Sequence, residues 1–276
     1  MKRYLLCTDL DRTLIPNGAQ PVSPAAGARF AQLAARADVT LVYVTGRHRA
    51  LIEQAVAEHN LPQAAYVIAD VGATIYQHGA SGWQQWHEWD EHIAPDWSDW
   101  THEELYRLLS VFPLLKIQEN EKQSRHKLSF YMPLDTDVQA LLAEIDILLM
   151  QAGISANLVW SIDEAAKIGL LDVLPACAGK LHALHFLMKK LGVARDSTIF
   201  SGDSGNDLDV LLSNIPSVLV ANATDDIKQQ VAHAVGAALY IARGDYLGMN
   251  GNYAGGILEG VAHYWPEVDA WLRTKK

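Results

Sequence analysis

Short apolar runs alternate with amphipathic stretches over most of the chain. The runs have the pattern of strands buried on both faces of a parallel sheet. They are Tyr4–Cys7, Val39–Val44, Tyr66–Asp70, Ser197–Ser201, Ser217–Ala221 and Leu239–Ala242. The stretches between them carry apolar residues at helical spacing, and Ser23 with Pro24 marks the start of the first helix as N-cap and first-turn residue. This alternation predicts an α/β fold with a doubly wound, mainly parallel sheet.

The pattern changes after Gly79–Gly82. Five of the eight tryptophans of the chain fall between Trp83 and Trp100, mixed with acidic residues and histidines. We expect helices and strands with polar faces to follow, over about 96–109, 114–119, 127–132, 136–152, 158–161 and 170–175. Such an order indicates a separate α+β layer. The sequence therefore predicts a core of residues 1–82 and 175–276 with an inserted cap domain over residues 83–174.

Composition narrows the class of protein. The chain has 276 residues, a formal net charge of −10 and a sequence pI of about 5.5. Since no basic stripe is available to neutralise phosphates, we expect no nucleic-acid partner. The two cysteines, Cys7 and Cys177, argue against a disulfide framework and favour the cytoplasm. No apolar run is long enough to span a bilayer, so we expect no membrane partner.

Polar residues follow the predicted strands and open the predicted helices of the core. They are Asp9 and Asp11, Thr45 and Gly46, Lys180, and Asp203 with Asn206 and Asp207. Because the carboxyl ends of parallel strands share one edge of a sheet, we expect these groups to converge there. That acids, a lysine and a hydroxyl all stand at corresponding ends by chance is much less probable than that any one of them does so.

The chemistry that these groups suit is phosphoryl transfer. Asp9, Asp11 and Asp203 offer the oxygen ligands that Mg²⁺ prefers. Asp9 is the candidate nucleophile, and Asp11 is the candidate general acid and base, a role for which burial and neighbouring carboxylates would raise its pKa.

Further residues of the group would bind the phosphate and orient its ligands. Thr45, with the N–H groups beside Gly46, and Lys180 would hold the phosphate oxygens. Asn206 and Asp207 would orient the metal ligands and Lys180.

These motifs resemble those of a known superfamily. The segments Asp9–Thr13, Val44–Arg47 and Gly202–Asp207, together with Lys180, are similar in order and spacing to the four motifs of the haloacid dehalogenase superfamily. The insertion resembles the larger α/β cap of its sugar-phosphatase branch. Within that branch, residues 118–131, 171–175 and 253–260 resemble the sucrose-6-phosphate phosphatase family.

The resemblance implies a Mg²⁺-dependent phosphatase of a disaccharide phosphate, most simply sucrose 6-phosphate. It also implies that the core holds the fructosyl phosphate, that the cap contacts the remaining sugar, and that the protein is a monomer that closes its cap over the substrate. The candidate substrate-binding residues are Arg47, His48, Gln118, Gln123, Lys127 and Tyr131. On alternating strand positions, the cap residues are equally well explained as a solvated sheet face.

Several alternatives stay open at this point. Arg47 with His48, and the long stretch 161–169, depart from the family pattern, so mannosylfructose phosphate or another sugar phosphate competes as substrate. A noncatalytic sugar-phosphate-binding protein on the same fold is a further alternative. A signalling receiver fits less well, because it has no need of the inserted domain. A sucrose-phosphate synthase is a candidate protein partner.

The tryptophans between 83 and 100 can stack on a sugar, but packing inside the protein explains them better.

Overall fold

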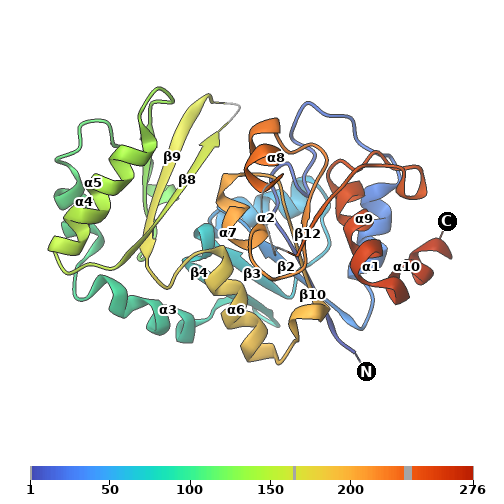
Figure 1. The fold of residues 1–276 in the computed structure, drawn as a ribbon. Helices are drawn as coiled ribbons and strands as arrows, with labels where there is room; N and C mark the ends of the chain where they lie inside the picture. Colours follow the sequence, from blue (N-terminus) through green and yellow to red (C-terminus); the bar gives the residue numbers. More distant parts are fainter. Residues whose placement is uncertain (1, 164–165, 233–237, 276) are drawn as a thin grey trace.

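A sheet of eight strands forms the centre of the computed structural model, which describes residues 2–163, 166–232 and 238–275 (Figure 1). Its strand order is β12-β11-β10-β1-β2-β3-β4-β5. The strands are β1 Tyr4–Thr8, β2 Val39–Val44, β3 Tyr66–Ala69, β4 Thr74–Gly79, β5 Gly82–Gln85, β10 Thr198–Gly202, β11 Ser217–Leu219 and β12 Leu239–Ile241. The first six in that order pair in parallel, and β4 and β5 form an antiparallel hairpin at one edge. This arrangement confirms the predicted doubly wound α/β core.

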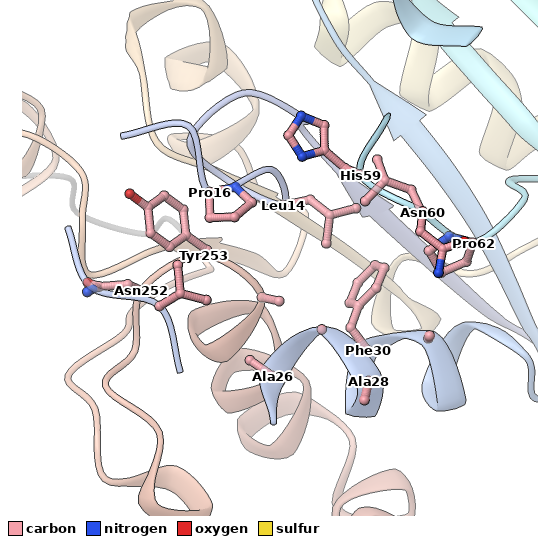
Figure 2. A pocket seen from close by; sticks show the side chains of 15 residues that line it. Leu14, Pro16, Ala26, Ala28, Phe30, His59, Asn60, Pro62, Asn252 and Tyr253 are labelled. Carbon is pink, nitrogen blue, oxygen red and sulfur yellow. The ribbon is translucent and has the colours of Figure 1, made fainter. Parts of the chain in front are cut away.

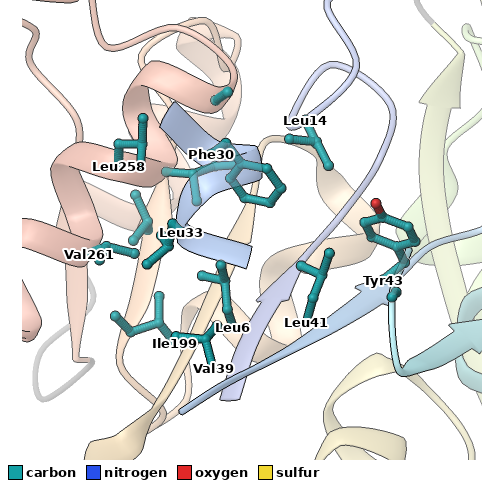
Figure 3. Close-up of a cluster of buried hydrophobic side chains, with 14 of the residues drawn as sticks. Leu6, Leu14, Phe30, Leu33, Val39, Leu41, Tyr43, Ile199, Leu258 and Val261 are labelled. Atoms are coloured by element: carbon teal, nitrogen blue, oxygen red, sulfur yellow. The ribbon is translucent and has the colours of Figure 1, made fainter. Parts of the chain in front are cut away.

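Helices cover both faces of this sheet, because the strands are apolar on both sides. In β1, Leu6 faces one buried cluster and Leu5 faces the other. The first cluster, shown in Figure 3, includes Phe30 and Leu258 from helices on that face. The helices of the two faces are α1 Ala26–Ala34, α2 Arg49–Glu58, α9 Ala254–Tyr264 and α10 Pro266–Arg273 on the first, and α3 His87–Ile93, α6 Lys180–Leu191, α7 Leu208–Leu211 and α8 Asp225–Ala232 on the second.

A second, antiparallel sheet lies beside the core (Figure 1). Its order is β6-β7-β9-β8, with strands β6 Lys116–Ile117, β7 Leu128–Met132, β8 Ala156–Asp163 and β9 Ile168–Pro175. Its helices, α4 His102–Leu109 and α5 Val138–Gln151, share a separate apolar cluster with it. We propose that this sheet and its helices form the cap domain, within the predicted range 83–174. Because β5 pairs with β4, the large sheet continues past residue 83, and we move the first boundary of the proposed cap beyond Gln85.

Two predictions about helices were wrong, and one helix, α10, was not predicted. Ser23 is not an N-cap: α1 begins at Ala26, and Ser23 Oγ instead accepts a hydrogen bond from the backbone N–H of Asn250. The helix predicted over 96–109 begins later, since Thr101 and Glu104 form a capping box that opens α4.

The clustered tryptophans pack inside the protein, as the packing hypothesis predicted. Trp89 and Trp97 are fully buried. Trp86 lies between Tyr66 and Phe186, with ring centroids 5.8 and 5.7 Å away. Of the long stretch 161–169, residues 164 and 165 lie outside the described part of the chain.

None of the helices that the structure describes combines the length and the apolar character needed to cross a membrane.

Gly260 provides a test of the packing between α9 and β11. A Cβ atom added to Gly260 would stand 2.1 Å from Val218 Cγ2. We expect Gly260→Ala to lower the free energy of unfolding by about 1–3 kcal/mol because of this overpacking. In the matched control, Gly27→Ala in α1, the added Cβ meets no described atom within 4 Å. There the better helix propensity of alanine should raise stability by up to about 1 kcal/mol. Urea unfolding measures both changes, and effects of the same sign and size would contradict the proposed contact.

Candidate active site

The first acidic residue of the site, Asp9, directly follows β1, at the point where the strand order of the sheet reverses. β2, the next strand in the chain, pairs with one side of β1, and β10 pairs with the other side. Ligands of open α/β sheets bind at such a switch point. The backbone N–H of Asp9 donates to Ser201 O (2.8 Å), which ties the end of β1 to β10. Only 5% of Asp9 is exposed. Asp9 therefore occupies a fixed and largely desolvated position.

Lys180, the first residue of α6, connects the acidic loops. Its Nζ donates to Asp9 Oδ1 (3.1 Å), Asn206 Oδ1 (2.7 Å) and Asp207 Oδ1 (2.7 Å). Burial alone acts to lower the pKa of Lys180, but the charges of Asp207 and Asp9 outweigh it and raise the pKa above its usual range. Lys180 is therefore a permanent buried cation beside the candidate nucleophile.

The loop after β10 is built around Asp207. Its Oδ2 accepts hydrogen bonds from the backbone N–H groups of Asp203 (3.0 Å) and Ser204 (3.1 Å). A Cβ atom on Gly202 would stand 2.6 Å from Asp207 Cγ, so glycine is needed for this close approach. Oδ1 of Asp207 thus contacts Lys180 and Oδ2 contacts the loop, while the role of Asp207 and Asn206 in orienting metal ligands stays a prediction.

Thr45 and Gly46 follow β2, next to this group. Thr45 is 1% exposed, and its N–H donates to Ile68 O (2.8 Å). A Cβ atom on Gly46 would come within 3.8 Å of Asn206 Nδ2, which places this loop beside the one after β10. The predicted phosphate-binding residues and the acidic group thus lie side by side.

Three carboxylates come close enough to share a cation. Oxygen atoms of Asp9, Asp203 and Asp207 all lie within 4.8 Å of one another. Burial, opposed by Lys180, raises the pKa of Asp9, and burial with the charge of Asp207 raises the pKa of Asp203 to about 7. Hard oxygen donors that carry excess negative charge suit Mg²⁺. Both oxygens of Asp207 accept hydrogen bonds, whereas Oδ2 of Asp9 and Oδ2 of Asp203 accept none from the described residues, so Asp9 and Asp203 are the better candidates for direct ligands.

The side chain of Asp11, which we predicted to join the metal site, faces a different partner. Arg47 binds it with two hydrogen bonds, Nε to Oδ2 and Nη2 to Oδ1, each 2.7 Å long. Asn17 Nδ2 adds a third at 2.7 Å. Burial acts to raise the pKa of Asp11, but the hydrogen bonds and charge of Arg47 lower it below the usual value. The expectation of a raised pKa was therefore wrong, because the sequence did not indicate that Arg47 would reach across the site to Asp11.

The loop after Asp11 contributes residues to which the sequence analysis gave no role. Thr13 Oγ1 donates to Asp203 Oδ1 (3.0 Å), and Arg12 Nε lies 3.3 Å from Asp203 Oδ2. Arg12 adopts a left-handed backbone conformation (φ 58°), which turns the chain sharply after the two acids. The signal available in the sequence was proximity, since Arg12, Thr13 and Asn17 all follow Asp11 within one short loop.

Most of the predicted sugar-binding residues of the cap have partners inside the cap. Gln118 Nε2 donates to Phe130 O (2.9 Å), and Gln123 exchanges hydrogen bonds with the backbone of Ser129. Tyr131 donates to Glu119 (2.8 Å). These contacts stabilise the strands β6 and β7 and leave few free polar groups for a ligand.

The remaining predicted substrate residues lie closer to the core. Lys127 is 4% exposed and lies 3.7 Å from Asp172 of β9. His48 is the N-cap residue of α2 and directly follows Arg47.

The cap sheet lies against the acidic loop. A Cβ atom on Gly205 would stand 3.2 Å from Trp160 O of β8. Val159 of β8 packs on the apolar cluster of the core. The cap strand β8 therefore borders the loop that carries Asp203 and Asp207.

A cavity of about 400 Å³ lies beside the loop after β1 (Figure 2). Leu14, Phe30 and Tyr253 are among its mostly apolar lining residues, which include no lysine or arginine. A phosphate needs positive charge and hydrogen-bond donors, so this cavity does not suit one.

Comparisons with known proteins agree with this geometry. The family model for sucrose-6F-phosphate phosphohydrolase matches residues 2–265. A HAD-like hydrolase of Nitrosococcus oceani is 45% identical over 99% of this chain and 75% of its own length. Probable sucrose-phosphatase 1 of Arabidopsis thaliana is 29% identical over 95% of this chain and 60% of its own length, so the plant relative is considerably longer. The mannosylfructose-phosphate phosphatase of Agrobacterium fabrum is 28% identical over 81% of this chain and 82% of its own length.

A solved structure shares the fold. The crystal structure of the sucrose-phosphatase from Synechocystis sp. PCC6803 superposes with a TM-score of 0.78, covering 96% of this chain and 98% of that one, at 24% identity. The match of the family model over nearly the whole chain, together with the relative at 45% identity, decides the family. The chain therefore belongs to the sucrose-6F-phosphate phosphohydrolase family and is a phosphoric monoester hydrolase of the sugar-phosphatase type.

Proposed function

We propose that this protein hydrolyses a disaccharide phosphate, in the first place sucrose 6-phosphate, with Mg²⁺ and through a phosphorylated Asp9. The observation that carries the proposal is the buried group in which Lys180 bridges Asp9 and Asp207, next to Asp203 and the Thr45 loop. The family match supports the substrate class. The related Synechocystis enzyme, whose structure was solved with sucrose and phosphate, supports sucrose as the sugar.

In the first step, a carboxylate oxygen of Asp9 attacks phosphorus and the bond from phosphorus to the sugar oxygen breaks. Asp11 gives a proton to the departing oxygen. Thr45, the backbone N–H groups beside it and Lys180 stabilise the charge on the phosphoryl oxygens. Mg²⁺ held by Asp9 and Asp203, when bound, offsets the repulsion between the carboxylate and the phosphate.

In the second step, Asp11 takes a proton from a water molecule, which attacks phosphorus and releases Asp9 as a carboxylate and the product as inorganic phosphate. The ionised state of Asp11, which Arg47 favours, suits this role as a base. For the first step Asp11 must carry a proton, so its hydrogen bonds with Arg47 have to break before the sugar departs. The pairing of Arg47 with Asp11 thus favours the base form over the acid form.

A second substrate has its own support. The mannosylfructose-phosphate phosphatase of Agrobacterium matches most of this chain at an identity similar to that of the plant sucrose-phosphatase. The same residues of the core would perform the same two steps on either substrate.

We further propose that the protein works as a monomer in the cytoplasm. The free thiols of Cys7 and Cys177 are compatible with a reducing compartment. Light scattering after size-exclusion chromatography tests the monomer, and a dimer would contradict it. A sucrose-phosphate synthase stays a candidate partner, to be tested by co-purification.

Replacement of the nucleophile is the first test of the mechanism. Asp9→Asn should lower kcat for p-nitrophenyl phosphate by at least about a thousandfold, because the amide cannot form the phosphorylated intermediate. The control is Asp38→Asn, which removes a carboxylate paired with Arg36 before the amino end of β2 and should leave turnover within about threefold of wild type. Unchanged turnover in Asp9→Asn would exclude Asp9 as the nucleophile.

Metal binding should depend on pH in a defined direction. Burial and Asp207 raise the pKa of Asp203 from 3.8 to about 7, so the metal-free folded protein keeps a proton that the unfolded chain releases. This contribution to stability is present at low pH and is lost as the pH rises through about 7. A cation replaces the proton, so Mg²⁺ should raise Tm more at about pH 8 than at about pH 6.

Chelation provides the accompanying activity measurement. EDTA should abolish turnover, and added Mg²⁺ should restore it. Full activity in EDTA, or a Tm shift that is larger at the lower pH, would argue against the proposed site.

The preferred sugar follows from kcat/KM values measured with Mg²⁺. We expect sucrose 6-phosphate to exceed fructose 6-phosphate and glucose 6-phosphate by about a hundredfold, because a site built to hydrogen-bond sugar hydroxyls rejects substrates that lack them. Mannosylfructose 6-phosphate is the competing disaccharide substrate. If it gives the higher value, the mechanism stands and the sugar assignment changes.

A further inference from the structure

The turn Asp70–Gly72 lies where the loops of the active site meet. The backbone N–H of Asp70 donates to Arg47 O (3.1 Å), and that of Val71 donates to Thr45 O (3.1 Å). On its other side, a Cβ atom on Gly72 would stand 2.2 Å from the carbonyl carbon of Gly179, the residue before Lys180. The turn is therefore packed between the proposed phosphate-binding loop and the start of α6.

The backbone of this turn is strained. Asp70 and Val71 both have left-handed conformations, with φ values of 52° and 58°. For a β-branched residue such as Val71 this conformation is a true outlier. Conformations of this kind persist only where the surroundings hold them, and they concentrate at functional sites. The phosphate chemistry proposed above gives the side chain of Asp70 no task.

One carboxylate oxygen of that side chain lacks a hydrogen-bond partner, although the side chain is buried. Asp70 is 3% exposed, and its Oδ1 has no partner among the described residues. Buried polar atoms without a partner are rare in native proteins, because each one loses its hydration without compensation. An unsatisfied carboxylate oxygen at this position therefore points to a donor that arrives with a ligand.

The largest charge effect on Asp70 comes from the cap. Burial raises the pKa of Asp70, and the charge of Lys127 is the largest factor that opposes this rise. A hydrogen bond with Thr74 and the charge of His48 oppose it as well. Lys127 already has cap partners, since its Nζ lies 3.7 Å from Asp172 and donates to Lys122 O (2.9 Å). The charge of Lys127 from the cap thus acts on Asp70 of the core, although the two form no ion pair among the described residues.

We propose that Asp70 accepts a hydrogen bond from a hydroxyl of the leaving sugar and so determines specificity from the core side. The turn is hydrogen-bonded to the loop of Thr45, so a sugar whose phosphate sits at Thr45 comes within its reach. Lys127 contacts the same sugar from the cap. The inference rests on the proposed function, because it requires a phosphorylated polyhydroxy substrate.

Asp70→Asn is the direct test. Asparagine keeps the size of the side chain and tolerates the left-handed backbone, but it loses the charge. For the preferred sugar phosphate, kcat/KM should fall by about ten- to a hundredfold, as expected for a lost hydrogen bond to a charged group. The fall for p-nitrophenyl phosphate, which has no sugar hydroxyl, should be at least about tenfold smaller. Asp38→Asn is the control for loss of a carboxylate elsewhere in the core.

Substrates that lack single hydroxyl groups distinguish two roles of Asp70. One is the proposed contact with the sugar, and the other is a latch, meaning a contact with Lys127 that holds the cap on the core. For an analogue that lacks the contacted hydroxyl, wild type and Asp70→Asn should differ by less than about twofold. An equal loss on every sugar phosphate and analogue would overturn the proposal in favour of a latch. An equal loss on p-nitrophenyl phosphate, or no loss at all, would overturn it as well.

The test is independent of which sugar is preferred. A flat wild-type profile would refute the proposed preference for sucrose 6-phosphate, whereas the ratio of wild type to Asp70→Asn can still be measured on each sugar phosphate. If Asp70→Asn does not fold, Lys127→Gln probes the same sugar from the cap. A selective loss on sugar phosphates supports the contact, and an equal loss on all substrates overturns it.

Discussion

Lys180 is a fully buried cation, and the geometry of the site depends on satisfying it. A buried charge without partners is strongly destabilising, so the fold has to bring acceptors to its Nζ. They come from two segments distant in sequence, Asp9 after β1 and Asn206 with Asp207 after β10. The close packing of Gly202 on Asp207 serves the same end, because it lets the carboxylate reach the lysine.

The same arrangement leaves the site with excess negative charge. Asp9, Asp203 and Asp207 converge, whereas Lys180 is the one fully buried cation among the described residues that touch them. Arg12 reaches Asp203 only from the rim, with its side chain 23% exposed. The imbalance raises the affinity of the carboxylates for protons and for cations alike. The proposed Mg²⁺ would compete with protons for these carboxylates and so keep Asp9 anionic beside an anionic substrate.

The sequence was sufficient to predict the sheet and the core of the site, because both follow from local patterns. β2 begins and ends at the predicted residues, Val39 and Val44. The acids, the lysine and the glycines were found because each stands at the end of a strand or the start of a helix. Side-chain pairings across the site were not accessible in the same way. Arg47 forms hydrogen bonds with Asp11, and Gln118 and Gln123 form hydrogen bonds with the cap backbone. The spacing of apolar and polar residues along the chain does not predict such contacts. Asp70 also stands at the end of a predicted strand, but it was given no role, because its left-handed backbone and its unpartnered carboxylate oxygen are visible only in the structure.

The contacts of Gly72 bring together the two segments that connect the core with the proposed cap. Its carbonyl oxygen accepts a hydrogen bond from Trp89 Nε1 (3.0 Å), at the point where the chain leaves the large sheet for the cap. Its Cα abuts Gly179, where the chain has come back from the cap to the core. Both connections between the core and the proposed cap are thus packed against one residue. A larger residue at position 72 would therefore disturb the exit to the cap, the return from it and the start of α6 at the same time.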